Sequence, residues 1–113
     1  MTTEAKCSNC RRPYPQQGAP YRCPACGAHF DIPSLVYDPV QVDASQPGLW
    51  RYCHTFGLPE SAPLVSLGEG NTPLEWRKIN RQKVAFKLEY QNPTGAFKDR
   101  GSAVLASFLL SRG

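Results

Sequence analysis

A strand gives way to a helix at Asn92-Pro93-Thr94-Gly95-Ala96-Phe97-Lys98-Asp99-Arg100-Gly101. Before this stretch, residues 83–89 alternate between polar and apolar side chains, which predicts a strand. After it, apolar or small residues recur at helical spacing and predict a core-facing helix; they are Phe97, Gly101, Val104, Leu105, Phe108 and Leu109. Thr94 is a candidate N-cap for this helix, and Gly113 lies where a C-cap would. The pattern predicts a fold of the α/β class.

One lysine in this stretch has an unusual chemical setting, because it lies in the first turn of the expected helix. The free amides and the helix dipole there disfavour a cation by some tenths of a kcal/mol, so they favour the neutral amine of Lys98. A neutral amine is what a Schiff-base lysine needs in order to attack a carbonyl carbon. The plainer alternative is a surface lysine that pairs with Asp99 or Glu89.

The segment before this unit contains a loop, a brief strand and a docking helix. The loop over residues 66–73 leads to the strand at residues 74–76. Further upstream, four apolar residues have the spacing of a short amphipathic helix; they are Leu49, Tyr52, Cys53 and Phe56. We expect this helix to end at Gly57 and to dock onto a larger body.

Two features of the same segment have plain structural interpretations. Cys53 stands next to His54, but adjacent residues on a helix point in different directions, so we expect a core cysteine rather than a catalytic dyad. Residues 30–37 predict a short strand, and Pro33 confines it to an edge or a bend. Residues 38–48 are polar and contain proline, which is typical of a linker.

Two Cys-x-x-Cys pairs lie near the N-terminus, and twelve residues separate Cys10 of the first pair from Cys23 of the second. Each pair places two thiolates on one tight turn, so Cys7, Cys10, Cys23 and Cys26 can complete the tetrahedron of ligands that zinc prefers. Gly27 supplies the positive φ angle that the second turn needs. Because four thiolates fill the coordination shell, we expect a structural rather than a catalytic zinc.

Two other interpretations of these cysteines stay open. Cys23 and Cys26 resemble a redox pair, but thioredoxin-like pairs need a βαβ context that this loop-rich segment does not offer. A nucleic-acid-binding ribbon needs more positive charge, since residues 1–30 sum to +3 before metal binding and +1 after it. His29 is expected to be a surface or packing residue rather than a fifth ligand.

Composition is that of a globular protein. The chain has 113 residues, a net charge of +4 and 41% hydrophobic residues, which excludes wholesale disorder and fibrous architectures. Its apolar stretches are far shorter than the roughly 18 residues that span a bilayer, and its first residues do not form a secretory signal. We therefore expect a cytoplasmic protein, in which reduced thiols favour metal binding over disulfides.

The lysine stretch from Pro93 to Gly101 resembles the pyridoxal phosphate (PLP) lysine signature of threonine synthases and their fold-type II, tryptophan synthase β-like relatives. The loop Gly68-Glu69-Gly70-Asn71-Thr72-Pro73-Leu74 resembles the loop before their first strand, and Trp50-Arg51-Tyr52 resembles their docking segment. The four-cysteine ribbon is similar to one found on many threonine synthases. Ala96 departs from the family, which more usually has Ser, so a hydroxyl contact to the cofactor would be absent.

This resemblance implies a lyase with PLP covalently bound to Lys98 and a structural zinc on the four cysteines. As a threonine synthase it would convert O-phospho-L-homoserine and water to L-threonine and phosphate. Other chemistries of the same fold are those of threonine dehydratase, diaminopropionate ammonia-lyase, cysteate synthase and cysteine synthase. The expected partner is a small amino-acid substrate, a homo-oligomer is allowed, and neither a membrane nor nucleic acid is expected.

With the resemblance, the chain divides into a zinc ribbon at residues 1–32, a linker and docking helix at 33–61, and the start of a PLP-enzyme domain at 62–113. One strand, turn and helix cannot bury the apolar face of that helix alone. The family's groups for the cofactor's phosphate and pyridine nitrogen find no counterpart here, so we expect an N-terminal fragment that is inactive by itself. The alternative from another class is a non-enzymatic zinc-ribbon adaptor.

Overall fold

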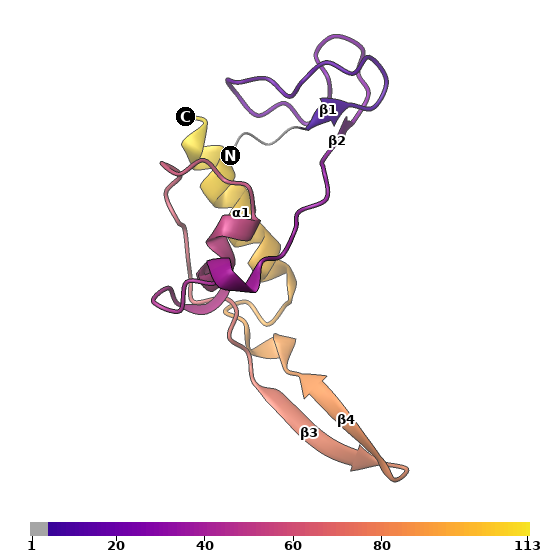
Figure 1. Ribbon diagram of the computed structural model, residues 1–113, viewed down its shortest axis with the longest axis vertical. Coiled ribbons are helices and arrows are strands. Elements are labelled where there is room, and N and C mark those ends of the chain that lie inside the picture. The colour runs from indigo at the N-terminus through magenta and orange to yellow at the C-terminus, as the bar shows by residue number, and fades with distance from the viewer. Residues whose placement is uncertain (1–4) are drawn as a thin grey trace.

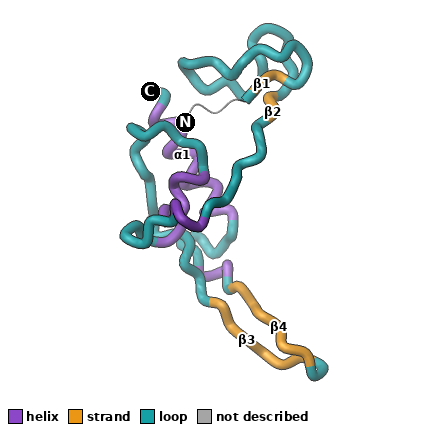
Figure 2. The backbone as a smooth tube through the Cα atoms, in the orientation of Figure 1, coloured by secondary structure: helices purple, strands orange, loops and turns teal. Residues whose placement is uncertain are grey.

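The computed structural model describes residues 5–113, and they form an elongated molecule with axes of 55 × 32 × 30 Å. The ribbon that holds the four cysteines lies at one end and a β-hairpin projects at the other (Figure 1). Between them lie the single α-helix of the described residues, α1 (Lys98–Ser111), and the 3-10 helix η2 (Gly48–Thr55). Loops make up most of the ribbon and of the connection to η2 (Figure 2).

The ribbon contains a very short antiparallel sheet. Strand β1 (Lys6–Cys7) pairs with β2 (Phe30–Asp31), with Lys6 opposite Asp31 and Cys7 opposite Phe30. The strand predicted over residues 30–37 is therefore wrong beyond its first two residues. Pro33 has no backbone N–H to donate to a ladder, which accounts for the early end of the strand. A second short 3-10 helix, η1 (Pro39–Gln41), follows in the linker.

The two later strands form an antiparallel hairpin. Strand β3 (Leu74–Ile79) pairs with β4 (Gln82–Lys87), so the predicted brief strand at 74–76 is longer than expected. The connection is Asn80-Arg81, and both residues have positive φ angles, 46° and 66°, as two-residue hairpin turns of the primed type require. The strand predicted at 83–89 ends earlier, at Lys87. The 3-10 helix η3 (Glu89–Gln91) follows after Leu88.

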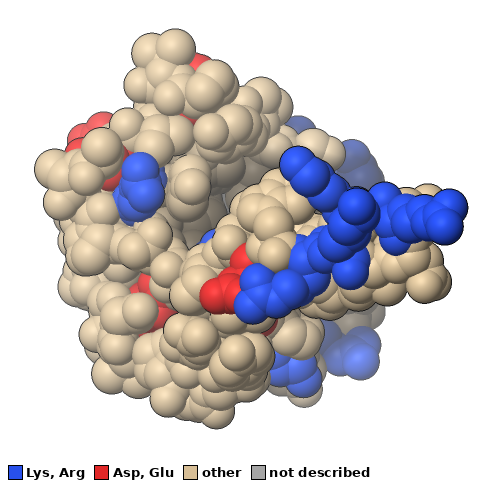
Figure 3. Space-filling model, turned by 90° about the horizontal axis from the view of Figure 1, so that it is seen from below, with Lys and Arg blue, Asp and Glu red and all other residues tan. Residues whose placement is uncertain are grey.

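Figure 3 views the molecule from the hairpin end, and Lys and Arg side chains gather there. The basic residues on the two strands and their turn are Arg77, Lys78, Arg81, Lys83 and Lys87. Only one acidic side chain lies on these strands, Glu75, which pairs with Arg77. The hairpin is therefore a basic and mostly exposed arm.

A small core joins η2 to α1. Trp50 is 2% exposed and packs with Leu49 and Ala103. Its indole Nε1 donates to the carbonyl oxygen of Val65 at 3.1 Å, and the amide of Val65 donates to Ser107 Oγ at 2.9 Å. The predicted docking helix therefore exists and docks on α1, although it is a 3-10 helix with non-helical angles at Tyr52 rather than an α-helix.

Cys53 has the packing role that its position predicts. It is partly buried against the cluster of Leu49, Trp50 and Ala103 and has a free thiol. The close packing around η2 also explains one glycine. Gly70 has a φ angle of +88°, and a Cβ there would lie 2.5 Å from the backbone nitrogen of Leu49, so the loop can approach η2 only with glycine at this position.

Helix α1 buries only part of the predicted face: Val104 is partly buried against the core of Leu49, Trp50 and Ala103. Its buried residues are Ala103 and Ser107, whereas Leu105 is 56% exposed and Phe97 is 65% exposed. At the contact with η2 the small side chain of Ala103 packs with Leu49 and Trp50, and Ser107 is the other buried residue of the helix. The large apolar side chains instead line a groove of about 720 Å³ between α1 and the ribbon; from α1 they are Val104, Leu105 and Phe108.

The ends of α1 differ in part from the prediction. Thr94 is not the N-cap, because Phe97 occupies that position without a side-chain hydrogen bond, and Thr94 bonds to Asp99 instead. At the other end Arg112 is the C-cap, and Gly113 follows it with a φ angle of +86°, the left-handed position that glycine favours after a helix. None of the helices in the described part of the chain is long and apolar enough to cross a membrane.

Candidate functional site

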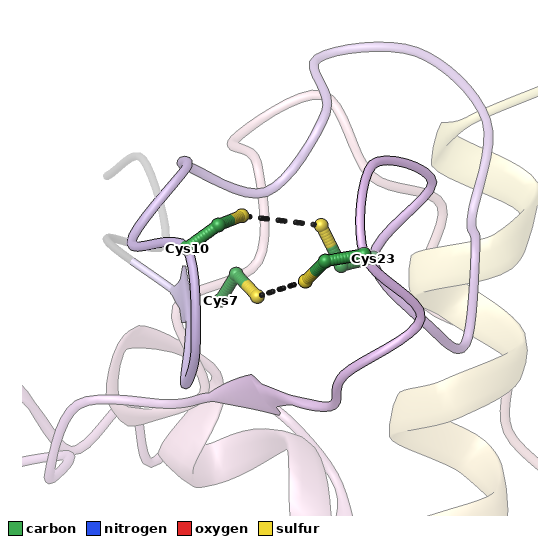
Figure 4. A group of neighbouring side chains, drawn as sticks. Cys7, Cys10 and Cys23 are labelled. Atoms are coloured by element: carbon green, nitrogen blue, oxygen red, sulfur yellow. Dashed lines mark hydrogen bonds between the residues drawn. The ribbon is translucent and has the colours of Figure 1, made fainter.

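The four predicted metal ligands lie together in the structure. The Sγ atoms of Cys7, Cys10, Cys23 and Cys26 all lie within 4.8 Å of one another. Cys7 Sγ is 3.4 Å from Cys26 Sγ, and Cys10 Sγ is 3.6 Å from Cys23 Sγ (Figure 4). A tetrahedron with zinc–sulfur bonds of 2.3 Å has sulfur–sulfur edges of about 3.8 Å, so this cluster is compatible with zinc.

The two cysteine turns have the same backbone hydrogen bonds. In the first, Arg11 N donates to Cys7 O at 3.1 Å and Cys7 N donates to Arg12 O at 2.8 Å. In the second, Gly27 N donates to Cys23 O and Cys23 N donates to Ala28 O, both at 2.8 Å. Both turns end in a left-handed residue, Arg11 with a φ of 60° and Gly27 with a φ of 75°. Gly27 was predicted for this role, whereas nothing in the sequence marked Arg11.

Backbone amides set much of the electrostatics of this cluster. The amide of Ala28, together with the thiol of Cys7, lowers the pKa of Cys26 to about 6. The amide of Ala25 lowers the pKa of Cys23. The amide of Arg12 also acts to lower the pKa of Cys10, but burial and the three neighbouring thiols outweigh it and raise that pKa to about 11. The donor set is one that a thiophilic divalent ion suits, because the ion neutralises charge that four adjacent thiolates would otherwise share.

His29 and Cys53 do not join this cluster in the described part of the chain. The imidazole of His29 is largely exposed, and its Nε2 lies 3.4 Å from the carboxylate of Asp31. Cys53 belongs to the core beside η2. The expectation that His29 is a surface residue is confirmed.

Lys98 is the first residue of α1, as the sequence predicts, and its side chain is exposed. It does not pack against the buried face of the helix. The alternative pairing is also absent: among the described residues Lys98 forms no ion pair with Asp99 or Glu89. Those two carboxylates have other partners, Thr94 for Asp99 and Arg100 for Glu89. The amine of Lys98 is therefore accessible.

The cysteine cluster and Lys98 lie toward opposite ends of α1. The ribbon contacts the C-terminal end of the helix, where Arg112 Nη1 donates to Pro15 O at 2.8 Å. The Arg112 guanidinium also lies over the rings of Tyr14 and Phe108, at 5.4 and 5.0 Å. A helix of 14 residues is about 21 Å long. A metal in the ribbon is therefore too remote from Lys98 to share its chemistry.

A polar network lies behind the first turn of α1, and sequence reasoning missed it. Arg100 donates from Nε and Nη2 to the two carboxylate oxygens of Glu89, both at 2.8 Å. Thr72 Oγ1 donates to the same carboxylate at 2.5 Å. The hydrogen bonds from Arg100 and then from Thr72 lower the pKa of Glu89 to about 2, and Glu89 in turn raises the pKa of Arg100.

The same network orders loop 68–73. Asn92 is buried; its Oδ1 accepts from Gly70 N at 2.9 Å, and its Nδ2 donates to Glu89 O at 2.9 Å. Glu69 is also buried, and its carboxylate accepts from Ser66 Oγ and Leu67 N, each at 2.8 Å. Buried side chains of these types need hydrogen-bond partners, but their burial could not be seen in the sequence.

The chain is similar in sequence to several threonine synthases. Over 88% of its length the chain is 33% identical to the threonine synthase of Methanosarcina acetivorans and, likewise, to that of Methanocaldococcus jannaschii. A shorter match over 57 residues is 44% identical to the threonine synthase of Halalkalibacterium halodurans and covers 47% of the chain.

The chain is similar to threonine synthases but much shorter than they are. It spans about a quarter of the length of the first two relatives, 26% and 27%. No family model and no solved structure matches the chain. The similarity to biosynthetic enzymes therefore rests on the named relatives.

Proposed function

We propose that the chain forms the N-terminal part of a PLP-dependent lyase of the threonine synthase type. Such an enzyme converts O-phospho-L-homoserine and water to L-threonine and phosphate. The observation that carries the proposal is Lys98: an exposed amine at the first residue of α1, within a chain that is similar to threonine synthases over 88% of its length. The proposal assigns Lys98 as the residue that holds the cofactor and moves protons at the substrate.

The surroundings of Lys98 fit this role. A lysine that reacts with an aldehyde must be accessible. Lys98 is exposed, and among the described residues it has no ion pair with Asp99 or Glu89. When bound, PLP supplies an electron sink for the substrate carbanion. The side chain of Lys98 would then take and return protons at the α and β carbons of the substrate.

We also propose that Cys7, Cys10, Cys23 and Cys26 hold one zinc ion. The support is the mutual approach of the four Sγ atoms within 4.8 Å and the amides that point at the sulfurs. Four sulfur ligands leave no open position for a substrate or a water molecule. The zinc therefore orders the ribbon, which then packs on the C-terminal end of α1 through Arg112.

The test of the activity uses the product of the complete gene. O-phospho-L-homoserine should yield threonine and inorganic phosphate in equal amounts, and Lys98→Ala should abolish both. A matched control is Lys83→Ala, which removes an exposed amine from the hairpin. Turnover of threonine or of O-acetylserine in place of phosphohomoserine would assign another chemistry of the same fold. Full activity of Lys98→Ala would contradict the proposal.

A further inference from the structure

The carboxylate of Glu89 accepts hydrogen bonds from neighbouring side chains at both of its oxygens. Its Oε1 accepts from Thr72 Oγ1 at 2.5 Å and from Arg100 Nη2 at 2.8 Å. Its Oε2 accepts from Arg100 Nε at 2.8 Å and from Asn92 Nδ2 at 3.1 Å. These four donors match the roughly four lone-pair directions that an ionised carboxylate offers. Glu89 therefore has no acceptor position left for a further donor such as the amine of Lys98.

The donors to Glu89 come from separate segments of the chain. Thr72 belongs to loop 68–73, Asn92 follows η3, and Arg100 is the third residue of α1. The Arg100 contact uses two parallel N–H groups, which fixes direction as well as distance. Arg100 Nη2 also donates to Thr72 Oγ1 at 3.2 Å. The first turn of α1 is therefore held against loop 68–73 through one carboxylate.

The direction of Arg100 also decides the direction of Lys98. Residues two apart on an α-helix lie about 200° apart around its axis. Because Arg100 turns toward Glu89, Lys98 faces away from it. Burial agrees, since the Arg100 side chain is 29% exposed whereas Lys98 is an exposed residue. A rotation of the first turn would change the direction of both side chains together.

A second contact joins the first turn of α1 to the loop that precedes it. Asp99 Oδ2 accepts from Thr94 N at 2.7 Å, and its other oxygen accepts from the Thr94 hydroxyl. The two residues that follow Lys98 are thus both held: Asp99 is tied to the preceding loop and Arg100 to Glu89. The exposed contact between Thr94 and Asp99 fixes the loop before the helix. The contact between Arg100 and Glu89 fixes the helix relative to the rest of the fold.

We propose that Glu89 and Arg100 are positioning residues, and that their ion pair sets the rotation of the first turn of α1 that presents the Lys98 amine to the cofactor. The inference rests on the proposed function, because it concerns the same lysine. Neither residue need touch the reacting atoms. A misplacement of about 1 Å at a reacting group costs on the order of 100-fold in rate, so loss of the pair should show in catalysis.

The experiment compares variants in the product of the complete gene. Glu89→Gln keeps the size of the side chain but removes its charge and replaces one acceptor oxygen, with two of the four acceptor positions, by a donor NH2 group. Arg100→Lys keeps the positive charge but removes the two parallel donors. For each variant, kcat is divided by the fraction of Lys98 that borohydride labels with PLP. We expect kcat per labelled site to fall about 10- to 100-fold in both, with KM changed by less than about threefold.

A double variant and a matched control separate positioning from folding. If the two residues act as one unit, Glu89→Gln with Arg100→Lys should lose no more than the worse single variant. Glu75→Gln is the control, because it breaks the comparable but exposed Glu75–Arg77 pair on the hairpin. It should keep the wild-type kcat. Thr72→Val provides a milder variant should Glu89→Gln fail to fold, and it should lower kcat per labelled site by a smaller factor.

The outcomes are distinguishable from failure of the proposed function. Wild-type kcat per labelled site in Glu89→Gln or, where that variant does not fold, in Thr72→Val would overturn the positioning role and leave Lys98 in place. Wild-type kcat per labelled site in Arg100→Lys would also overturn it, because the positive charge at residue 100 would then suffice without the two parallel donors. Absence of PLP on Lys98 in the wild type would overturn both proposals.

Discussion

Ser107 Oγ accepts a hydrogen bond from the backbone amide of Val65 at 2.9 Å and donates one to Ala103 O at 2.9 Å. This buried serine joins α1 to the segment that also receives the indole N–H of Trp50. We expect Ser107→Ala to destabilise this core by about 1–3 kcal/mol, because the amide of Val65 loses its partner away from water. Urea unfolding followed by Trp50 fluorescence, with Trp76 replaced by Phe, measures the change.

The exposed Ser102 provides the control for this variant, because it lies on the same helix. Ser102→Ala should leave the free energy of unfolding within about 0.5 kcal/mol of the wild type, as surface substitutions usually do. Equal effects of the two variants would show that Ser107 has no special part in the core.

Removal of zinc should unfold the ribbon but not the rest of the chain. The ribbon buries few apolar side chains, so metal binding should supply most of its folding free energy, on the order of 10 kcal/mol for such sites. We expect one zinc per chain by elemental analysis. Cys23→Ser or a strong chelator should disorder residues 5–30 in an NMR spectrum while the resonances of β3 and β4 stay in place. Protein purified in reducing buffer without zinc, yet with an ordered ribbon, would contradict the site.

Acid should weaken the attachment of α1 to loop 68–73. The pKa of Glu89 is lowered from its usual 4.5 to about 2, so the folded state favours the ionised carboxylate. The stability that Glu89 contributes is present above about pH 4.5 and is lost as the pH falls toward 2. We expect the free energy of unfolding to fall less steeply over this range in Glu89→Gln than in the wild type. Identical slopes would show that Glu89 gains nothing from Arg100.

The groove between α1 and the ribbon should bind a hydrophobic dye. The large apolar side chains that line it from α1 include Leu105, which is 56% exposed. In the 113-residue chain we expect Leu105→Glu to lower the fluorescence of such a dye severalfold, because it places a charge in the apolar groove. Leu67→Glu, at a residue that is 77% exposed and lies outside the groove, should change it little.

Local patterns predicted the local structure well. The Cys-x-x-Cys spacing brought four sulfurs together because each turn is built from adjacent residues. The break at residues 92–95 placed Lys98 in the first turn of α1, although the predicted N-cap at Thr94 was wrong. The buried face of α1 could not be predicted in the same way. Periodicity favoured the large apolar residues, whereas the helix buries Ala103, which packs with Trp50, and Ser107.

The network around Glu89 was missed for a related reason. Glu89 is 11 residues from Arg100 and 17 from Thr72, so no spacing rule connects them. Their types gave only a weak signal, since Glu and Arg are common on surfaces. The sequence left Lys98 open between a lysine activated by the helix and a surface lysine, because the helical pattern that placed it in the first turn does not determine the direction of its side chain.

The assignment of Lys98 is tested most directly by reduction with borohydride. Treatment of the complete gene product with borohydride should fix PLP on a lysine as a stable secondary amine, and mass spectrometry of the peptides identifies that lysine. We expect the label on Lys98 and on no other lysine, because Lys78, Lys83 and Lys87 lie on the hairpin, away from the first turn of α1. A label on any hairpin lysine, with Lys98 unmodified, would contradict the account.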